Sequence, residues 1–305
     1  MQTRGLLFSR AVLHIAGIGM VRCSTRKTGM IDLHIHSTLS DGRDTPEGIV
    51  ACVCRLGLKA FAITDHDSVK SLAMARKALP SSDGPILVSG VEISAFEGTS
   101  DIHVLGYHFD DKDHTFVEAL AHLRDRRKAR AQDIVAHLNQ LGLNLTYSDV
   151  LTAANGAAVT RPHIAQALLK SGLVNSYGAA FRDYLANGRP ACVPHQTISP
   201  KEAIQLIHNA GGVAILAHPG ATGRDELIRS MVHSGLDGLE VWHPYHCQAM
   251  IRFYKRLAIK YSLKPTGGSD THGFGSRADS IGVPHVPWAI HEHLHQTAAA
   301  RLRQR

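Results

Sequence analysis

Short apolar segments that end in histidine or a carboxylate recur along this sequence, and they limit its possible folds more than any other feature. In the first, Ile31–His36, two histidines two residues apart follow an apolar run. Residues at this spacing point to the same side of a strand, so both imidazoles would face one site. Similar placements follow at Thr64-Asp65-His66-Asp67, Gly90-Val91-Glu92, Asp101-Ile102-His103, Ala217-His218-Pro219 and Gly268-Ser269-Asp270-Thr271-His272.

Strand and helix patterns alternate through most of the chain. The apolar runs predict strands over residues 31–35, 59–63, 86–92, 102–107, 213–217, 238–242, 264–267 and 281–283. Helices are predicted over residues 46–56, 68–79, 200–209, 225–234 and 248–261, with a last one near the C-terminus. Repeated β–α units favour a parallel sheet, and their number suits a closed or nearly closed barrel.

A long stretch in the middle of the chain lacks strand patterns. It predicts helices over residues 115–141, 148–153, 161–170 and 177–186. We therefore expect residues 30–112 and 199–305 to form the metal-binding barrel, and residues 113–198 to form a helical insertion that sets substrate specificity. Residues 1–29 are expected to be a disordered leader or the product of a mis-assigned start, and are left out of the predicted fold.

Composition narrows the class of protein. The 305 residues include 21 histidines, which fits a metal site. The formal net charge is +7, but five of the basic residues precede Met30, so the remainder carries only about +2 and indicates no broad nucleic-acid surface. Five scattered cysteines do not form a disulfide framework, which favours the cytoplasm. No segment is long enough to span a membrane, and nothing indicates an obligate protein partner.

The polar ends of the predicted strands would meet in space. In a β/α barrel the carboxyl ends of the strands converge on one face, where such enzymes carry their chemistry. His34, His36, His66, Glu92 and His218 would then surround one site together with Asp270 and His272. Because imidazole and carboxylate groups are metal ligands, the sequence predicts a metal centre at that face.

Two other motif classes are disfavoured. Residues 291–295 contain the pattern H-E-x-x-H, which is typical of zinc proteases. It lies in a polar predicted helix near the C-terminus with no third ligand downstream, so we do not expect it to form such a site. The glycines form neither a Walker loop nor a dinucleotide fingerprint, which argues against a nucleotide-dependent kinase and a Rossmann enzyme.

The strand-end motifs resemble those of the PHP (polymerase and histidinol phosphatase) family, from Asp32–Ser37 to Gly268–His272. Within the family the chain resembles the stand-alone bacterial branch of 3′,5′-nucleoside bisphosphate phosphatases and RNase AM-type 5′→3′ exoribonucleases. The segments shared with that branch are Asp101–Tyr107, Thr160–Ala165 and Val193–Gln196. The resemblance implies an α/β fold, a distorted (β/α)7 TIM-like barrel with an inserted helical subdomain.

The resemblance also implies a site for three divalent ions. Imidazole and carboxylate ligands without thiolate suit Mn²⁺, Fe²⁺ or Zn²⁺, and the resemblance makes Mn²⁺ the first choice. The implied ligands are His34, His36, Glu92 and Asp270 for one ion, Asp41, His66 and His272 for a second, and Glu92, His103 and His218 for a third. Asp65 and Asp67 flank His66 and are expected to fix imidazole tautomers.

The implied chemistry is phosphate ester hydrolysis. A water that bridges two ions would lose a proton near neutral pH and attack phosphorus. Asp41, His66 and Glu92 would take part in catalysis as ligands of these ions. The leaving oxygen needs a proton, for which His195 and His246 are candidates. The sequence has no G-x-S-x-G motif, so a serine nucleophile is not indicated.

Substrate recognition is assigned to the insertion. Arg161 begins a predicted helix after Thr160, where the guanidinium and the helix amides could together hold a phosphate. The alternative is an ordinary salt bridge, and the resemblance favours a clamp for a second, non-reacting phosphate. His163 and Lys201 are further candidates for binding the substrate.

Several substrates fit this chemistry. The first hypothesis is removal of the 3′-phosphate from nucleoside 3′,5′-bisphosphates such as pAp, which yields a 5′-mononucleotide and phosphate. The alternative is a 5′→3′ exoribonuclease that acts on short RNA or RNA 5′ ends with the same site. A histidinol-phosphate phosphatase is less favoured because of the Arg161 segment. A non-catalytic metal-binding regulator is also less favoured, because every ligand position is filled.

Overall fold

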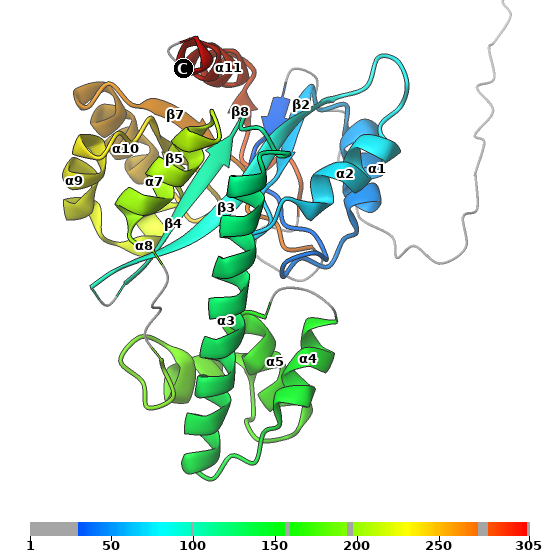
Figure 1. Ribbon diagram of the computed structural model, residues 1–305, viewed down its shortest axis with the longest axis vertical. Coiled ribbons are helices and arrows are strands. Elements are labelled where there is room, and N and C mark those ends of the chain that lie inside the picture. The colour runs from blue at the N-terminus through cyan, green and yellow to red at the C-terminus, as the bar shows by residue number, and fades with distance from the viewer. Residues whose placement is uncertain (1–29, 99, 156–158, 194–197, 274–279, 304–305) are drawn as a thin grey trace, which may run out of the picture.

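The computed structural model describes residues 30–98, 100–155, 159–193, 198–273 and 280–303. These residues form a barrel of strands covered by helices, with a helical lobe beyond one end of the barrel (Figure 1). The segment expected to be a leader, residues 1–29, lies outside the described residues. Among the helices that are described, none is long and apolar enough to cross a membrane.

Eight strands form a single sheet in the order β7-β6-β5-β4-β3-β2-β1-β8. Their bounds are β1 Met30–Asp32, β2 Ala60–Ile63, β3 Ile86–Glu97, β4 Ser100–Tyr107, β5 Val213–Leu216, β6 Gly238–Trp242, β7 Lys264–Gly267 and β8 Val286–Pro287. The sheet nearly closes, because Ile35 after β1 forms a parallel bridge with Thr271 after β7. The result is the distorted TIM-like barrel predicted from the sequence.

Two strand predictions were wrong. The sheet is not wholly parallel, because β4 is antiparallel to both β3 and β5. β4 follows β3 directly in a hairpin. No helix lies between them to bring the chain back to the end of the sheet where β3 starts, so β4 runs in the opposite direction to β3. The last strand is not at residues 281–283 but at β8, antiparallel to β1. Gly282 instead lies in a turn at a φ of 77° and donates its amide to Asp32.

The helices follow the local signals of the sequence. They are α1 Pro46–Leu56, α2 Lys70–Ala78, α3 His114–Gln140, α4 Tyr147–Ala154, α5 Arg161–Lys170, α6 Tyr177–Ala180, α7 Pro200–Asn209, α8 Pro219–Thr222, α9 Ile228–His233, α10 Gln248–Lys260 and α11 Ala289–Leu302. A π-helical turn, Phe181–Leu185, continues α6, and a short 3₁₀ turn, Asp225–Leu227, precedes α9. α1 is typical: Thr45 caps its start, Pro46 is its first residue, and Gly57 ends it at a φ of 71°.

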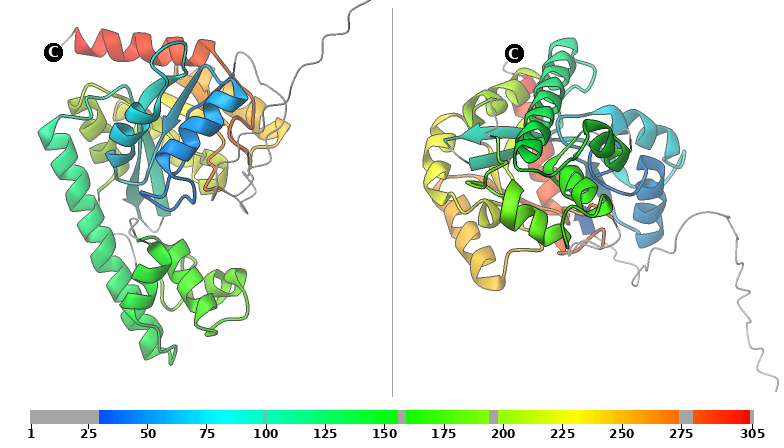
Figure 2. Two further views of the ribbon diagram at one scale, coloured as in Figure 1. Left: turned by 90° about the vertical axis from the view of Figure 1, so that its right-hand side faces the viewer. Right: turned by 90° about the horizontal axis from the view of Figure 1, so that it is seen from below.

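The helical lobe has a hydrophobic core of its own. Its apolar side chains come from the second half of α3 and from α4, α5 and the π-helical turn, and include Ile134, Leu138, Ile164 and Leu168. The first half of α3 instead packs on the barrel through Phe116 and Leu120. Helix α3 therefore runs from the barrel into the lobe, as Figure 2 shows, and holds the lobe over one end of the barrel.

Candidate metal centre

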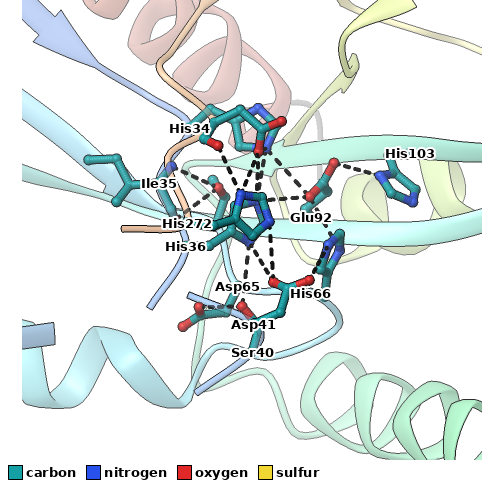
Figure 3. A network of polar contacts seen from close by, with 12 residues as sticks. His34, Ile35, His36, Ser40, Asp41, Asp65, His66, Glu92, His103 and His272 are labelled. Atoms are coloured by element: carbon teal, nitrogen blue, oxygen red, sulfur yellow. Dashed lines mark hydrogen bonds and ion pairs between the residues drawn. The ribbon is translucent and has the colours of Figure 1, made fainter. Parts of the chain in front are cut away.

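The side chains predicted to bind metal lie together at the end of the barrel that faces the lobe. Glu92, on β3, lies at their centre (Figure 3). Its Oε2 lies 3.2 Å from His36 Nε2, 3.2 Å from His66 Nδ1 and 3.4 Å from His34 Nε2. Its Oε1 lies 2.9 Å from His103 Nδ1 and 3.0 Å from His218 Nε2. One buried carboxylate thus contacts five imidazoles, which come from four different parts of the barrel.

Two aspartates complete the cluster from either side of Glu92. Asp270 Oδ1 lies 3.3 Å from His34 Nε2 and 3.1 Å from His36 Nε2. Asp41 lies 3.4 Å from His272 and 3.6 Å from both His66 and His36. Asp270 and His218 have positive φ values, 48° and 25°, which non-glycine residues rarely adopt. Such local strain is typical of positions where a functional side chain must point in one direction.

The cluster divides into three sets of side chains whose ligand atoms could share an ion. They are His36, Asp41, His66 and His272; His34, His36 and Glu92; and His66, Glu92 and His103. The first two match the sets implied by the family resemblance, with His36 added to one of them and Asp270 close to the other. In the third, His66 takes the place expected for His218, although His218 contacts the same oxygen of Glu92 as His103 does.

The chemistry of these residues fits bound cations. Asp41 Oδ1 and His66 Nδ1 are buried and have no hydrogen-bond partner among the described residues, a costly state that a metal ion would relieve. Burial favours a raised pKa for Glu92, but His103, His66 and His34 hold it well below its usual range. Burial favours a lowered pKa for His36, but Asp270 and Glu92 raise it to about 10. The ionised carboxylates therefore favour positive charge in the site. Metal ions can supply that charge in place of protons on the imidazoles.

The groups that orient the imidazoles differ from those predicted. Asp65 accepts hydrogen bonds from Ser37 and from Ser40 Oγ, and Asp67 accepts from Ser94 N and from Arg127. Within the described structure neither contacts an imidazole, so the prediction that they fix tautomers directly was wrong. Both instead connect neighbouring segments that carry the ligands: Asp65, after β2, holds the loop after β1, and Asp67 holds β3 and α3.

Glu240 orients the His34 imidazole, and sequence reasoning missed it. Its Oε1 lies 3.0 Å from His34 Nδ1, which turns His34 Nε2 toward Glu92, and its Oε2 accepts a 2.7 Å bond from the backbone amide of His218. His243 was missed as well, and its Nε2 lies 3.1 Å from Asp270 Oδ2. The available signal was Glu240 itself, a carboxylate in the middle of an apolar strand.

A cavity of about 280 Å³ joins the metal centre to the lobe. Asp41, His66 and Glu92, from the barrel, line part of it, and three arginines of α3 and α5, Arg127, Arg130 and Arg161, line another part. Arg161 reaches from the start of α5 to Asp101 on β4 at 2.5 Å and also donates to Asn187 at 2.9 Å. Arg127 and Arg130 were missed, because α3 carries several arginines and its pattern does not show which of them face inward.

The remaining candidates lie away from this cavity or are held by other groups. His163 Nδ1 accepts from the amide of Thr160 and so caps α5, and Lys201 is exposed on α7. His246 is near the site, but its Nδ1 lies 2.9 Å from Val241 O and its Nε2 accepts from Gly220 N at 3.1 Å. With both ring nitrogens engaged in this way, His246 is poorly placed to protonate a leaving group. His195 lies outside the described residues.

The barrel and its cluster of histidines and carboxylates define a hydrolytic enzyme that works through bound metal ions. The family model for the PHP domain matches residues 32–262, and the chain belongs to this family. It is a metal-dependent phosphoesterase.

Known proteins resemble the chain over most of its length. The Escherichia coli 5′-3′ exoribonuclease Rnm is 34% identical over 247 residues, 79% of this chain and 84% of that protein. The 3′,5′-nucleoside bisphosphate phosphatase of Chromobacterium violaceum is 32% identical over 258 residues, 83% of this chain and 90% of the phosphatase. The solved structure of a candidate metal-dependent phosphoesterase from Bifidobacterium adolescentis superimposes with a TM-score of 0.78 at 30% identity, covering 90% of this chain and 98% of that one.

Proposed function

We propose that this phosphoesterase hydrolyses the 3′-phosphate of nucleoside 3′,5′-bisphosphates such as pAp to a 5′-mononucleotide and phosphate. The observation that carries the proposal is the cavity, which is lined both by three arginines and by members of the cluster of metal ligands. A bisphosphate carries two anionic groups, so one could lie at the metal centre while the other lies against the arginines.

The metal centre would hold the reacting phosphate. Three divalent ions, Mn²⁺ in the first place with Fe²⁺ or Zn²⁺ as alternatives, would bind through His34, His36, Asp41, His66, Glu92, His103, His218, Asp270 and His272. When bound, such ions lower the pKa of a coordinated water and offset negative charge on phosphoryl oxygens. Glu240 holds His34 with its Nε2 toward Glu92, so this part of the site needs no rearrangement before the reaction.

The arginine side would hold the second phosphate. Arg127 is fixed by Asp67 and Ser94 Oγ, whereas Arg161 is bound to Asp101, a partner that a phosphate could replace. Arg130 donates from Nε to Val193 O, and although burial lowers its pKa to about 10, it is charged at neutral pH. A monophosphate bound at the metal centre would leave these cations without a second phosphate. This difference supports selection for a bisphosphate.

The second candidate is 5′→3′ cleavage of short RNA or RNA 5′ ends, favoured by the likeness to the Escherichia coli exoribonuclease. Both reactions break the bond between a 3′ oxygen and phosphorus, so they need the same arrangement of ligands. A terminal 5′-phosphate on RNA could bind the arginines as the 5′-phosphate of pAp would. The two candidates therefore differ in the group that the reacting phosphorus carries on its far side, a free oxygen in pAp and the next nucleotide in RNA.

The test is product release by the Mn²⁺-loaded full-length protein from pAp, 5′-AMP and a short 5′-phosphorylated RNA, with a His34→Ala variant as control. Fast phosphate release from pAp alone, absent in the variant, is the expected result. Mononucleotides from RNA at a higher kcat/KM than phosphate from pAp would move the exoribonuclease to first place. No product from any of the three would overturn both candidates.

A further inference from the structure

A second group of histidines lies at the other end of the barrel from the metal centre. His108 directly follows β4, and His291 and His295 lie one helical turn apart on α11. Figures 1 and 2 show that α11 covers the end of the barrel opposite the helical lobe. The buried side of α11 packs on the barrel through Ile290 and Leu294, so the helix is fixed next to β5 and β7.

The three imidazole rings lie close together, and two of their three separations are near those of metal ligands. The ring centroids are 5.6 Å apart for His108 and His291, 5.4 Å for His108 and His295, and 6.3 Å for His291 and His295. Because a ring nitrogen lies about 2 Å from bound zinc, the centroids of two coordinating imidazoles are about 5 Å apart. The ring nitrogens do not yet converge as tightly as those of the catalytic clusters, so the rings must turn about their Cβ–Cγ bonds to meet at one ion.

Two buried ring nitrogens in this group lack a partner. His108 Nε2 and His291 Nδ1 are shielded from solvent and form no hydrogen bond within the described residues. Native proteins rarely leave buried polar atoms in this state, and a bound ion is one of the few explanations. The backbone of His108 also has a φ of 56°, a conformation that is uncommon for a residue other than glycine and that directs its ring toward α11.

The charge state of these rings favours metal over protons. Burial lowers the pKa of His108 to about 4, and the neighbouring His291 and His295 add to this effect. Burial also lowers the pKa of His291, and His295 adds to the effect, whereas Glu292 opposes it. The carboxylate of Glu292 accepts a 2.9 Å bond from Trp288 Nε1 on the exposed surface. Neutral imidazoles keep a lone pair for an ion at neutral pH.

We propose that His108, His291 and His295 form a second, separate site for a divalent transition metal ion, with Zn²⁺ as its first choice. Ligands that are all imidazoles suit zinc, copper or nickel better than manganese. The sequence motif H-E-x-x-H supplied two of the ligands, and the third comes from far upstream rather than downstream. Since Glu292 is turned to Trp288, the site binds an ion without the general base of a zinc protease. The ion would fasten α11 to the end of β4.

The test is zinc stoichiometry, measured by elemental analysis on the full-length protein after metal removal, equilibration with Zn²⁺ and desalting. The variants are His108→Gln and the double variant H291Q/H295Q. His293→Gln is the matched control, because His293 is exposed on the same helix and belongs to neither site. We expect wild type and control to bind one ion more than either variant, and zinc to raise their unfolding midpoints by a few degrees more.

Equal stoichiometry in wild type and both variants would overturn the proposal. A loss in the double variant without a loss in His108→Gln would also overturn it, because it would indicate only a histidine pair on a helix surface. Phosphoesterase activity of each Mn²⁺-loaded variant, at the wild-type rate, shows that the variant has folded and that the catalytic ions are in place. If a variant has not folded, the single substitution His295→Gln at the exposed ring replaces it in the same measurement.

Discussion

The two walls of the substrate cavity differ in how firmly their side chains are held. On the barrel wall, Glu92 is 1% exposed, and the buried His34 ring that contacts it is held by the equally buried Glu240. On the lobe wall, Arg161 is 21% exposed and pairs with Asp101, which is 16% exposed. Glu92 and its contacts are thus fixed before substrate arrives, whereas Arg161 on the lobe wall, unlike the buried Arg127, has a contact that a substrate can replace.

This difference separates chemistry from selection. Groups that stabilise charge in a reaction work best when they are already in place, because any rearrangement adds to the barrier. Groups that select a substrate can release one partner and bind another. The comparison predicts that substitutions on the barrel wall reduce turnover of every substrate, and that substitutions on the lobe wall reduce binding of bisphosphates alone.

The largest effect is expected for Glu92→Gln. The carboxylate contacts five imidazoles, and an amide would leave two candidate ion sites without their shared negative charge. We expect kcat to fall by on the order of 10³-fold, together with a lower metal content. Steady-state phosphate release and elemental analysis measure both. Glu97→Gln, at the exposed end of the same strand, should behave as wild type. If Glu92→Gln were as active as that control, the barrel wall would have been misidentified.

A smaller loss is expected for Glu240→Gln, which touches ligands but no substrate. Removing a group that orients a ligand typically costs 10–100-fold in metal affinity. The variant should therefore need roughly that much more Mn²⁺ for half-maximal activity and should approach the wild-type kcat at saturating Mn²⁺. A kcat that stays low at every Mn²⁺ concentration would show that Glu240 does more than position His34.

On the lobe wall, Arg161→Ala should raise the KM for pAp by about 10-fold or more, as expected for a lost charged hydrogen bond. The kcat should change little, because the reacting phosphate lies at the other wall. Arg182→Ala is the matched control, since Arg182 is an exposed arginine of the same insertion that pairs with Asp183. An unchanged KM would return Arg161 to the role of a structural salt bridge with Asp101.

The smallest effect concerns stability away from the cavity. Arg301 on α11 pairs with Asp237 at 2.7 Å, and His208 lies 2.8 Å from the same carboxyl. Although burial alone would raise the pKa of Asp237, His208 and Arg301 lower it. Its contribution is present above the unfolded pKa, about 3.9, and is lost as pH falls through the lower folded pKa. Arg301→Gln should therefore lower the unfolding midpoint by a few degrees at pH 7. The difference in unfolding midpoint between Arg301→Gln and wild type should shrink below about pH 4. A difference that stays constant with pH would contradict this prediction.

Regular elements with strong local signals could be predicted from the sequence. The helices at residues 161–170 and 200–209 and the strands at 238–242 and 264–267 have the predicted bounds, because a capping residue or glycine marks their ends. β4 was predicted as a strand over residues 102–107, but its antiparallel direction could not be predicted, because the direction depends on the hairpin with β3 and not on its own residues. β8 consists of only two residues and carries no pattern.

The residues of the candidate site, too, could be predicted from the sequence only in part. Ligands such as His34 and His272 follow strands, so a periodic pattern pointed to them. Arg127 could not be told apart from the other arginines of α3, since only packing against Asp67 decides which of them is buried. Glu240 and His243 were missed because they serve other side chains rather than a substrate, although a carboxylate within an apolar strand was a usable signal.

The most direct test of the division between the two walls is kcat/KM for pAp and for 3′-AMP, which lacks the 5′-phosphate, in wild type, Glu92→Gln and Arg161→Ala. Glu92→Gln should lose activity on both substrates by a similar factor. Arg161→Ala should lose activity on pAp and keep it on 3′-AMP. An equal loss on both substrates in Arg161→Ala would contradict the account, because the lobe wall would then act in the chemistry and not in the choice of substrate.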